Sequence, residues 1–210
     1  MSEQNAELLK KYLPAEVAIT MSKWIDHFQV ELTISKPRQS VLGDYRHPYA
    51  GRGHRISINV DLNPYAFLIT LIHEFAHLSN WNTYRNKVKA HGEEWKTEYK
   101  RLMNPFIAKG IFPERIETAL RRYMNNPAAA SCTDIHLLKV LKEFDPVSKT
   151  VFVSTVPMGG IFKMKSGREF QKMALLRKRF KCKEIGTGAI YLFSPVSEVF
   201  YEEVENYSSE

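Results

Sequence analysis

NPYAFLITLIHEFAHLSN, residues 63–80, is the stretch from which the rest of this chain can be interpreted. Asn63 is a favourable N-cap and Pro64 suits the first helical position, where its missing N–H does no harm, so a helix is expected here. At about 100° per residue, His73 and His77 lie roughly 40° apart on one face of that helix. The opposite face carries an apolar stripe, formed by Phe67, Leu68, Leu71, Ile72, Phe75 and Leu78. We therefore expect a helix that packs by one side and presents two imidazoles on the other.

The two histidines enclose Glu74 in the pattern His-Glu-x-x-His. Two imidazoles four residues apart on a helix can bind one zinc ion, and the glutamate beside the first can take a proton from the metal's water. A chance pairing of two surface histidines is the simpler alternative. The placement of the pattern on a helix with an apolar back favours the metal interpretation, with His73 and His77 as ligands and Glu74 as the general base.

A catalytic zinc needs a third protein ligand and keeps one position open. His91 lies at the start of the next expected helix, with Gly92 leaving room beside it, and is our preferred third ligand. Glu94 and Glu98 are the alternatives, because carboxylates also complete such sites.

The length, charge and cysteine content of the chain limit the class of protein to which it can belong. The chain has 210 residues and a net charge of +7, which suits either an acidic partner such as nucleic acid or ordinary solubility. Only Cys132 and Cys182 are present, so no disulfide framework is expected and a reducing cytoplasm fits. The first residues lack the basic and apolar regions of a signal peptide, and no apolar run approaches membrane-spanning length.

The order of the expected elements indicates an α+β protein with two parts. Helices and half-buried strands alternate in the first part, residues 1–127, with helices at 3–12, 15–27, 91–103 and 116–124, and strands at 28–34, 38–45 and 54–60. The second part, residues 128–210, has short strand-like pieces separated by glycine turns, at 151–153, 160–164, 179–183 and 189–193. We expect a small antiparallel sheet in the first part and a β-rich module in the second.

Peptide hydrolysis at this site also requires a donor for the oxyanion of the tetrahedral intermediate. The sequence leaves four candidates unranked: Tyr45, His54, Arg55 and Tyr84. The strand at 54–60 is a candidate for pairing with an extended peptide substrate, an expectation that rests on the geometry of zinc peptidases in general.

These features resemble the SprT-like family, the bacterial relatives of the Spartan protease that acts on DNA–protein crosslinks. The residues that carry the resemblance are Leu71-Ile72-His73-Glu74-Phe75-Ala76-His77 and Ala90-His91-Gly92-Glu93-Glu94-Trp95, with Met103 following. The resemblance covers roughly residues 3–123. It implies a zincin-like metallopeptidase domain, His91 as the third zinc ligand, and substrates among proteins bound to DNA.

The chain departs from the family in its second part. Many SprT-like proteins end in a zinc ribbon held by two cysteine pairs, whereas Cys132 and Cys182 stand alone. A mixed site with His136 is conceivable, but we favour two incidental thiols and a module that folds by its own packing.

A cluster of basic residues in the second part again favours a nucleic-acid partner. Phe162, Phe170 and Phe180 are interleaved with it and suit base stacking. We prefer the alternative, a solvated charged face with the phenylalanines in the core. The cluster consists of Lys163, Lys165, Arg168, Lys172, Arg177, Lys178, Arg179, Lys181 and Lys183.

The sequence therefore favours a zinc-dependent metallopeptidase over two other classes. One is a nucleic-acid-binding or regulatory protein with a structural or inactive zinc site, against which the presence of Glu74 argues. The other is a metal-dependent hydrolase of a non-peptide substrate. The oligomeric state is not indicated.

Overall fold

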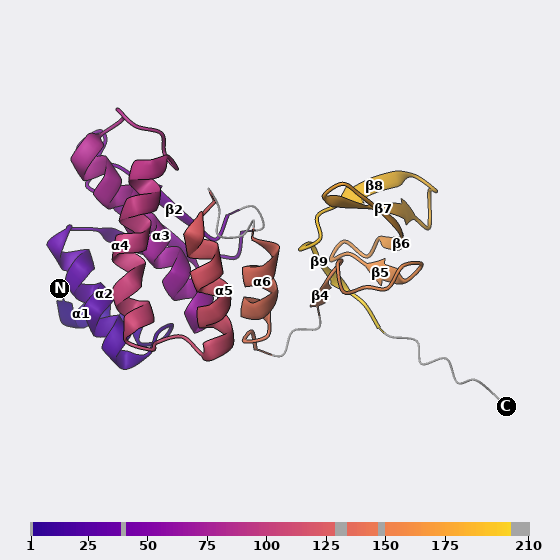
Figure 1. The fold of residues 1–210 in the computed structure, drawn as a ribbon, viewed down its shortest axis with the longest axis horizontal. Helices are drawn as coiled ribbons and strands as arrows, with labels where there is room; N and C mark the ends of the chain where they lie inside the picture. The colour runs from indigo at the N-terminus through magenta and orange to yellow at the C-terminus, as the bar shows by residue number, and fades with distance from the viewer. Residues whose placement is uncertain (1, 39–40, 129–133, 147–149, 203–210) are drawn as a thin grey trace. The chain divides into compact units, whose positions relative to one another are not determined.

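The computed structural model describes residues 2–38, 41–128, 134–146 and 150–202. Within these ranges the chain forms six helices and two β-sheets, which confirms the α+β class. Contacts between residues group the chain into two compact units, Met1–Asp145 and Pro146–Glu210. The figures draw both units (Figure 1), and each is described here by itself.

The first unit begins with two helices, continues with three strands and ends with four helices. Its elements in chain order are α1 (Ser2–Leu9), α2 (Ala15–His27), β1 (Glu31–Ser35), β2 (Gly43–Arg46), β3 (Arg55–Asn59), α3 (Pro64–Tyr84), α4 (Glu93–Ala108), α5 (Glu114–Asn125) and α6 (Ile135–Lys142).

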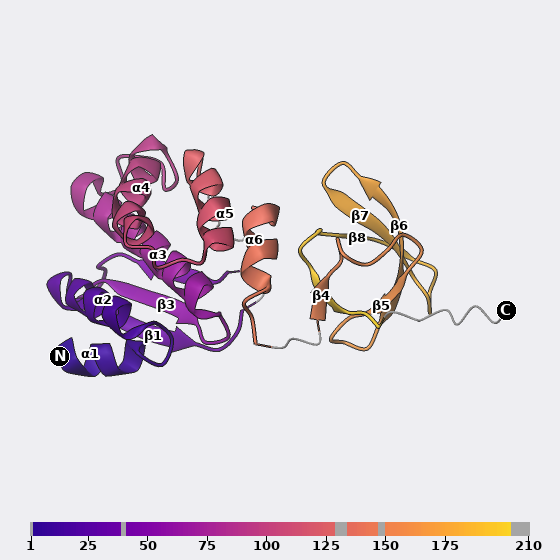
Figure 2. The same cartoon turned by 60° about the horizontal axis from the view of Figure 1, so that its bottom comes forward.

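Helix α3 is the central element of this unit and lies between the sheet and helices α4 and α5 (Figure 2). It begins where the sequence indicates, because the Asn63 side chain accepts hydrogen bonds from the N–H groups of Tyr65 and Ala66. The expectation that α3 packs by only one side was wrong. Thr70, His73 and Glu74, on the face with the histidines, are buried as well. Residues 66–76 are buried on every face of the helix, so Thr70, His73 and Glu74 lie in a protein interior.

The sheet of the first unit is mixed, and our expectation of an antiparallel sheet was wrong. Its strand order is β1-β3-β2, with β1 parallel and β2 antiparallel to β3. The chain reverses direction between β2 and β3, and β3 then pairs on its other side with β1, which runs in the same direction as β3. Residues 54–60 thus lie in the centre of the sheet and have no free edge for a peptide. Among the described strands, β2 is the edge beside α3.

The first unit extends further than the sequence indicates. The sequence placed its end at residue 127, whereas α6 packs against α5 and belongs to the same unit. The buried Leu137, Val140 and Leu141 join its core. The side-chain amide of Asn63 donates to the carbonyl of Leu141 at 2.8 Å and to the Asp145 carboxylate at 2.7 Å. Helix α6 has only 8 residues, too few to give a clear helical period in the sequence.

The second unit is built on one six-stranded sheet with the order β4-β9-β5-β6-β7-β8. Its strands are β4 (Thr150–Phe152), β5 (Ile161–Lys163), β6 (Glu169–Leu176), β7 (Arg179–Glu184), β8 (Ile190–Phe193) and β9 (Glu198–Phe200). The sequence indicated β4, β5, β7 and β8 but missed the other two. Strand β6 is interrupted by a register shift between Lys172 and Ala174, which breaks the alternation that a strand normally shows.

The interior of the second unit contains a buried lysine. Lys172 is 3% exposed, and its ammonium donates to the carbonyls of Val153 at 2.9 Å, Ser154 at 3.3 Å and Val156 at 2.5 Å. The nitrogen also lies 3.9 Å from the centre of the Phe180 ring. A buried charge needs such partners, because an ammonium without them would be strongly destabilising. Lys172 is therefore a core residue.

The three phenylalanines of the basic cluster are also buried, as the alternative we preferred expects of these side chains. Phe162 and Phe170 are 1% exposed and Phe180 is 8% exposed. Base stacking on them is therefore excluded in this structure. Cys182 is buried and has a free thiol, and Cys132 lies outside the described residues.

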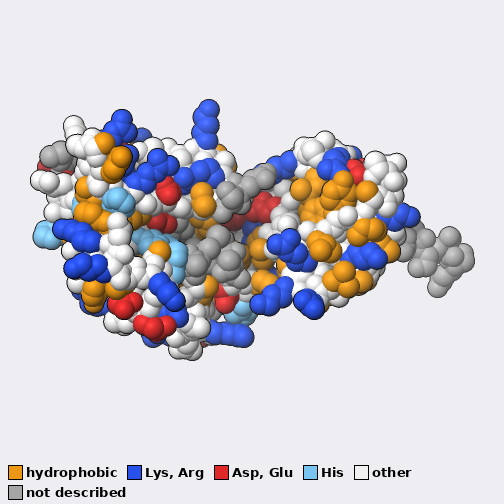
Figure 3. All heavy atoms as spheres, turned by 90° about the horizontal axis from the view of Figure 1, so that it is seen from above, with side chains coloured by type: hydrophobic (Ala, Val, Ile, Leu, Met, Phe, Trp, Pro, Cys, Tyr) orange, Lys and Arg blue, Asp and Glu red, His pale blue; other side chains and the backbone are white. Residues whose placement is uncertain are grey.

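Several basic side chains of the cluster nevertheless reach the surface. Figure 3 shows basic and hydrophobic side chains interspersed on the face of the second unit that it presents. Lys163 pairs with Glu169 at 3.1 Å and Arg168 pairs with Glu184 at 2.6 Å. That arginine, followed by the Thr187 hydroxyl, lowers the pKa of Glu184 to about 2. Among the described residues, no helix is both long enough and apolar enough to cross a membrane.

Candidate metal centre

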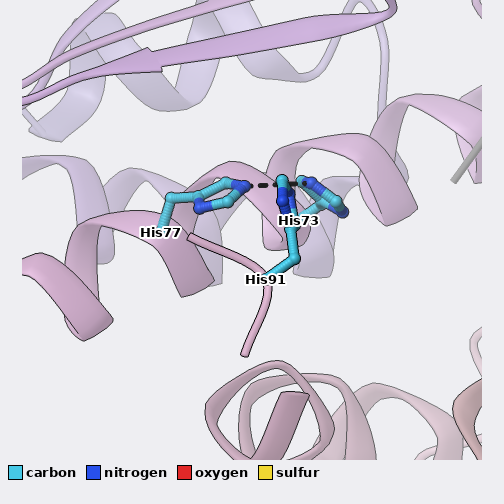
Figure 4. Close-up of side chains that lie close together, drawn as sticks. All are labelled: His73, His77 and His91. Atoms are coloured by element: carbon cyan, nitrogen blue, oxygen red, sulfur yellow. Dashed lines mark hydrogen bonds between the residues drawn. The ribbon is translucent and has the colours of Figure 1, made fainter. Parts of the chain in front are cut away.

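Helix α3 places His73 and His77 side by side, one turn apart. Their Nε2 atoms are 3.2 Å from each other (Figure 4). His73 is 5% exposed, whereas His77 is partly open to solvent. The spacing of four residues thus gives the geometry that the sequence predicts.

His91 comes from the loop that leads into α4 and points at the same place (Figure 4). The centre of its ring lies 4.5 Å from that of His77 and 5.6 Å from that of His73. Trp95, in the first turn of α4 and fully buried, contacts all three imidazoles. The packing of α4 on α3 through this indole therefore holds the loop against the helix.

The three histidines form the only metal-competent cluster among the described residues. One ligand atom from each lies within 4.8 Å of the others. The alternatives considered for the third position lie outside this cluster. Glu94 is exposed, and Glu98 accepts hydrogen bonds from Ser79 and Arg101.

All three imidazoles are held in the neutral form. Burial, followed by repulsion from the other two rings, lowers the pKa of His73 well below its usual range. Burial and then His91 lower the pKa of His77 to about 3, and burial lowers the pKa of His91. Neutral imidazoles keep a lone pair on one ring nitrogen, which is the form that binds metal.

The donor set fits a zinc ion. In a tetrahedral site with zinc–nitrogen bonds of about 2.0–2.1 Å, two ligand nitrogens are about 3.3 Å apart. The separation observed between His73 and His77 is 3.2 Å. In addition, two buried ring nitrogens, Nε2 of His91 and Nδ1 of His73, have no hydrogen-bond partner among the described residues. Three neutral donors that converge in this way match the ligand number of a catalytic zinc site.

Glu74 is buried beside this cluster, under the edge strand β2. Burial first, and then Asp44, raise its pKa to about 8, against the opposing effects of Arg38 and a backbone hydrogen bond from Tyr45. Gly43 is in close contact with it, since a Cβ at that position would lie 2.7 Å from Oε1 of Glu74. A cation at the three histidines would favour the carboxylate form and lower this pKa again.

The histidines and Glu74 open into a cleft of about 380 Å³. Of the four oxyanion candidates, only Tyr45 lines it. Its hydroxyl is 2.9 Å from Nδ1 of His54, and burial raises its pKa, so it remains a protonated donor. Arg55 and Tyr84 do not line the cleft. The lining residues are Gly43, Asp44, Tyr45, His73, Glu74, His77, Asn80, Trp81, Arg85, Asn86, Val88, Ala90 and His91.

Sequence reasoning missed several residues that shape the site. Gly43 was noted only as part of a strand, and no local pattern shows that its backbone lies against Glu74. Trp81 could have been found, because it follows His77 by four residues and so shares the stripe of His73 and His77.

A comparison with known families adds an independent finding. The model of the SprT-like family matches residues 12–118, just over half of the chain. The match contains the sheet of the first unit, α3, the loop with His91 and α4. No curated protein and no solved structure gives a match.

Proposed function

The chain belongs to the SprT-like family, and from this premise we propose that it is a zinc-dependent metallopeptidase. One observation carries the proposal. Three neutral imidazoles converge within 4.8 Å at the side of a buried carboxylate, Glu74, and all four side chains line one cleft. A structural zinc site has no use for an additional carboxylate of this kind.

His73, His77 and His91 would hold the metal. When bound, zinc supplies a Lewis acid that polarises a carbonyl and a water molecule of lowered pKa. The three histidines provide the ligand number that leaves one coordination position for that water.

Glu74 would handle the protons. Its carboxylate accepts a proton from the attacking water and donates it to the leaving amine, as a general base and then a general acid. Burial under β2 restricts its movement and excludes bulk water, so the carboxylate is held where the proton is transferred. Tyr45 is the remaining candidate to donate a hydrogen bond to the oxyanion, because it is the only one of the four candidates that lines the cleft.

Strand β2 would bind the substrate backbone. It has one described neighbour, β3, and its Gly43–Tyr45 segment lines the cleft. An extended peptide that pairs with this edge would pass the histidines and Glu74. This replaces the pairing with residues 54–60 considered from the sequence.

We further propose that substrates include proteins associated with DNA. The observation that favours a nucleic-acid partner is a set of basic residues in the second unit for which no acidic partner is described: Lys165, Arg177, Lys178, Arg179, Lys181 and Lys183. Such a surface suits phosphate contacts without base recognition. A nucleic-acid-binding protein with an inactive zinc site is the second candidate function.

The replacement of Glu74 by Gln tests the peptidase proposal. The amide has nearly the same shape and is not a ligand, so zinc content should stay the same, while cleavage of an unstructured protein or of a DNA-bound protein should fall about 10²- to 10⁴-fold. Glu114→Gln, on the surface at the start of α5, is the matched control and should behave like the parent.

The second candidate function makes a different prediction for the same variants. If the zinc site is only structural, Glu74→Gln changes nothing and His73→Ala unfolds the first unit. Elemental analysis and cleavage assays on both variants separate the two cases. A zinc-loaded Glu74→Gln protein that cleaves as fast as the parent would overturn the peptidase mechanism.

A further inference from the structure

Arg85 stands at the end of the histidine stripe of α3. His73, His77 and Trp81 follow one another at intervals of four and share one face of the helix. Arg85 is the next residue in that series and the first after the helix. It lines the same cleft as the histidines. The stripe that carries the metal ligands therefore continues into an aromatic residue and a cation.

The guanidinium of Arg85 is held in place. Its central carbon lies 3.9 Å from the centre of the Trp81 ring, a cation–π contact. His47 stacks on the same indole, with the ring centres 5.4 Å apart and the planes 4° from parallel. The Arg85 backbone has a φ of 55°, in a region that favours glycine. Strain of this kind is retained where the surrounding structure requires it, commonly at binding sites.

This cation has no acidic partner among the described residues. Its Nη1 makes only long hydrogen bonds, to the Trp81 carbonyl at 3.4 Å and to Oδ1 of Asn82 at 3.3 Å. Asp44, which also lines the cleft, is paired with Arg46 at 2.8 Å. Arg85 is the only described lysine or arginine in the cleft lining.

The positive charge of Arg85 affects the pKa values of two neighbouring groups, His54 and Tyr45. After burial, its charge is the next cause that lowers the pKa of His54. It also lowers the pKa of Tyr45, against the larger opposing effect of burial. The cleft thus contains a fixed positive charge, and its planar fork matches the two oxygens of a carboxylate.

We propose that Arg85 binds a carboxylate of the substrate and makes the peptidase selective for acidic peptides. The inference rests on the proposed function and adds its substrate class. Trp81, under the guanidinium, is one helical turn beyond His77, a distance of about 5–6 Å along the helix axis. An extended peptide covers that distance in about two residues. The carboxylate therefore lies about two residues from the bond that is cut.

Two sources can supply this carboxylate. One is the side chain of an aspartate or glutamate within a longer chain, and the other is the free C-terminus of a short peptide. Peptide pairs that differ only by Glu against Gln, or only by a free against an amidated C-terminus, distinguish them.

The test uses the zinc-loaded full chain and a mixed peptide library whose cleavage sites are read by mass spectrometry. The parent should cleave preferentially where an acidic group lies about two residues from the scissile bond. Arg85→Gln should lose about 10- to 100-fold in kcat/KM on acidic peptides and nothing on their neutral counterparts. Arg85→Lys should keep part of the preference, because it keeps the charge but loses the fork.

Lys87→Gln is the matched control, since it removes one positive charge from the same loop without lining the cleft. It should retain the acidic preference. Zinc content and thermal unfolding should be alike in all variants, so the ratio of acidic to neutral cleavage isolates the role of Arg85. An equal preference in the parent and Arg85→Gln, or none in the parent, would overturn the inference while leaving the peptidase function intact. A zinc-loaded parent that cleaves no peptide would overturn both.

Discussion

Each unit buries several polar atoms that face one another, but the two units differ in what satisfies these atoms. In the second unit, three backbone carbonyls meet around a cation that the chain itself supplies, the ammonium of Lys172. In the first unit, three imidazoles meet and the described residues supply no cation to them. A cluster of acceptors that carries its own donor is complete and stabilises the fold. A cluster of lone pairs without one is suited to an external ion.

The largest expected effect is on the first unit and comes from metal. Zinc in 1,000-fold excess over its dissociation constant should stabilise this unit by about 4 kcal/mol, because it binds the folded cluster and not the unfolded chain. The three tryptophans, Trp24, Trp81 and Trp95, all belong to the first unit, so tryptophan fluorescence follows its unfolding alone. A chelator should reverse the effect.

The histidine variants sharpen this result. His73→Ala should abolish the response to zinc, whereas His136→Ala, on the surface of α6, should retain it. If His73→Ala still responds to zinc, the converging imidazoles are not the zinc site. The first unit would then not differ from the second in needing an external ion.

The next effect is on the second unit and comes from its own cation. Lys172→Met fills a similar volume but leaves buried carbonyls without their donor, at about 1–3 kcal/mol for each unsatisfied group. We expect a loss of about 3 kcal/mol in the unfolding free energy of this unit, measured by hydrogen exchange of the amides of β6 and β7. Lys165→Met, at an exposed position, should change it by less than about 0.5 kcal/mol. An unchanged unit in Lys172→Met would mean that the ammonium is not what completes the cluster.

The smallest effect concerns surface cations without described partners. Replacement of Arg177, Lys178 and Arg179 by Ala should weaken non-specific DNA binding and lower the slope of log affinity against log salt by about 2.7, at about 0.9 for each lost phosphate contact. The control removes three cations that have acidic partners, Lys10, Arg115 and Arg121. Equal slopes in the two triple variants would remove the nucleic-acid proposal.

The sequence was most informative where a property is local. The start of α3 follows from the hydrogen-bonding capacity of Asn63 and the fixed backbone of Pro64, both properties of single residues. The proximity of His73 and His77 follows from helix geometry alone. His91 could be proposed by its spacing and family resemblance, but its approach depends on how α4 packs on α3 through Trp95, and no local pattern gives that packing.

The sequence was least informative about which strands pair with each other in a sheet. The alternation at 54–60 indicated a strand correctly, but a period of two does not tell a central strand from an edge strand. Lys172 was assigned to the surface because lysines are rarely buried. A signal was available, since Lys172 lies two residues after Phe170 in β6 and so belongs to the same face of the strand.

The hydrogen bonds of Asn63 have a consequence for biosynthesis. Its amide reaches partners 78 and 82 residues further along the chain, at Leu141 and Asp145. On the ribosome, the histidines of α3 emerge well before these partners do. Helix α3 can therefore complete the contacts at its first turn only when the last helix of the unit has been synthesised. In a nascent chain, the helix that carries the candidate metal ligands therefore lacks these two contacts until α6 and Asp145 have left the ribosome.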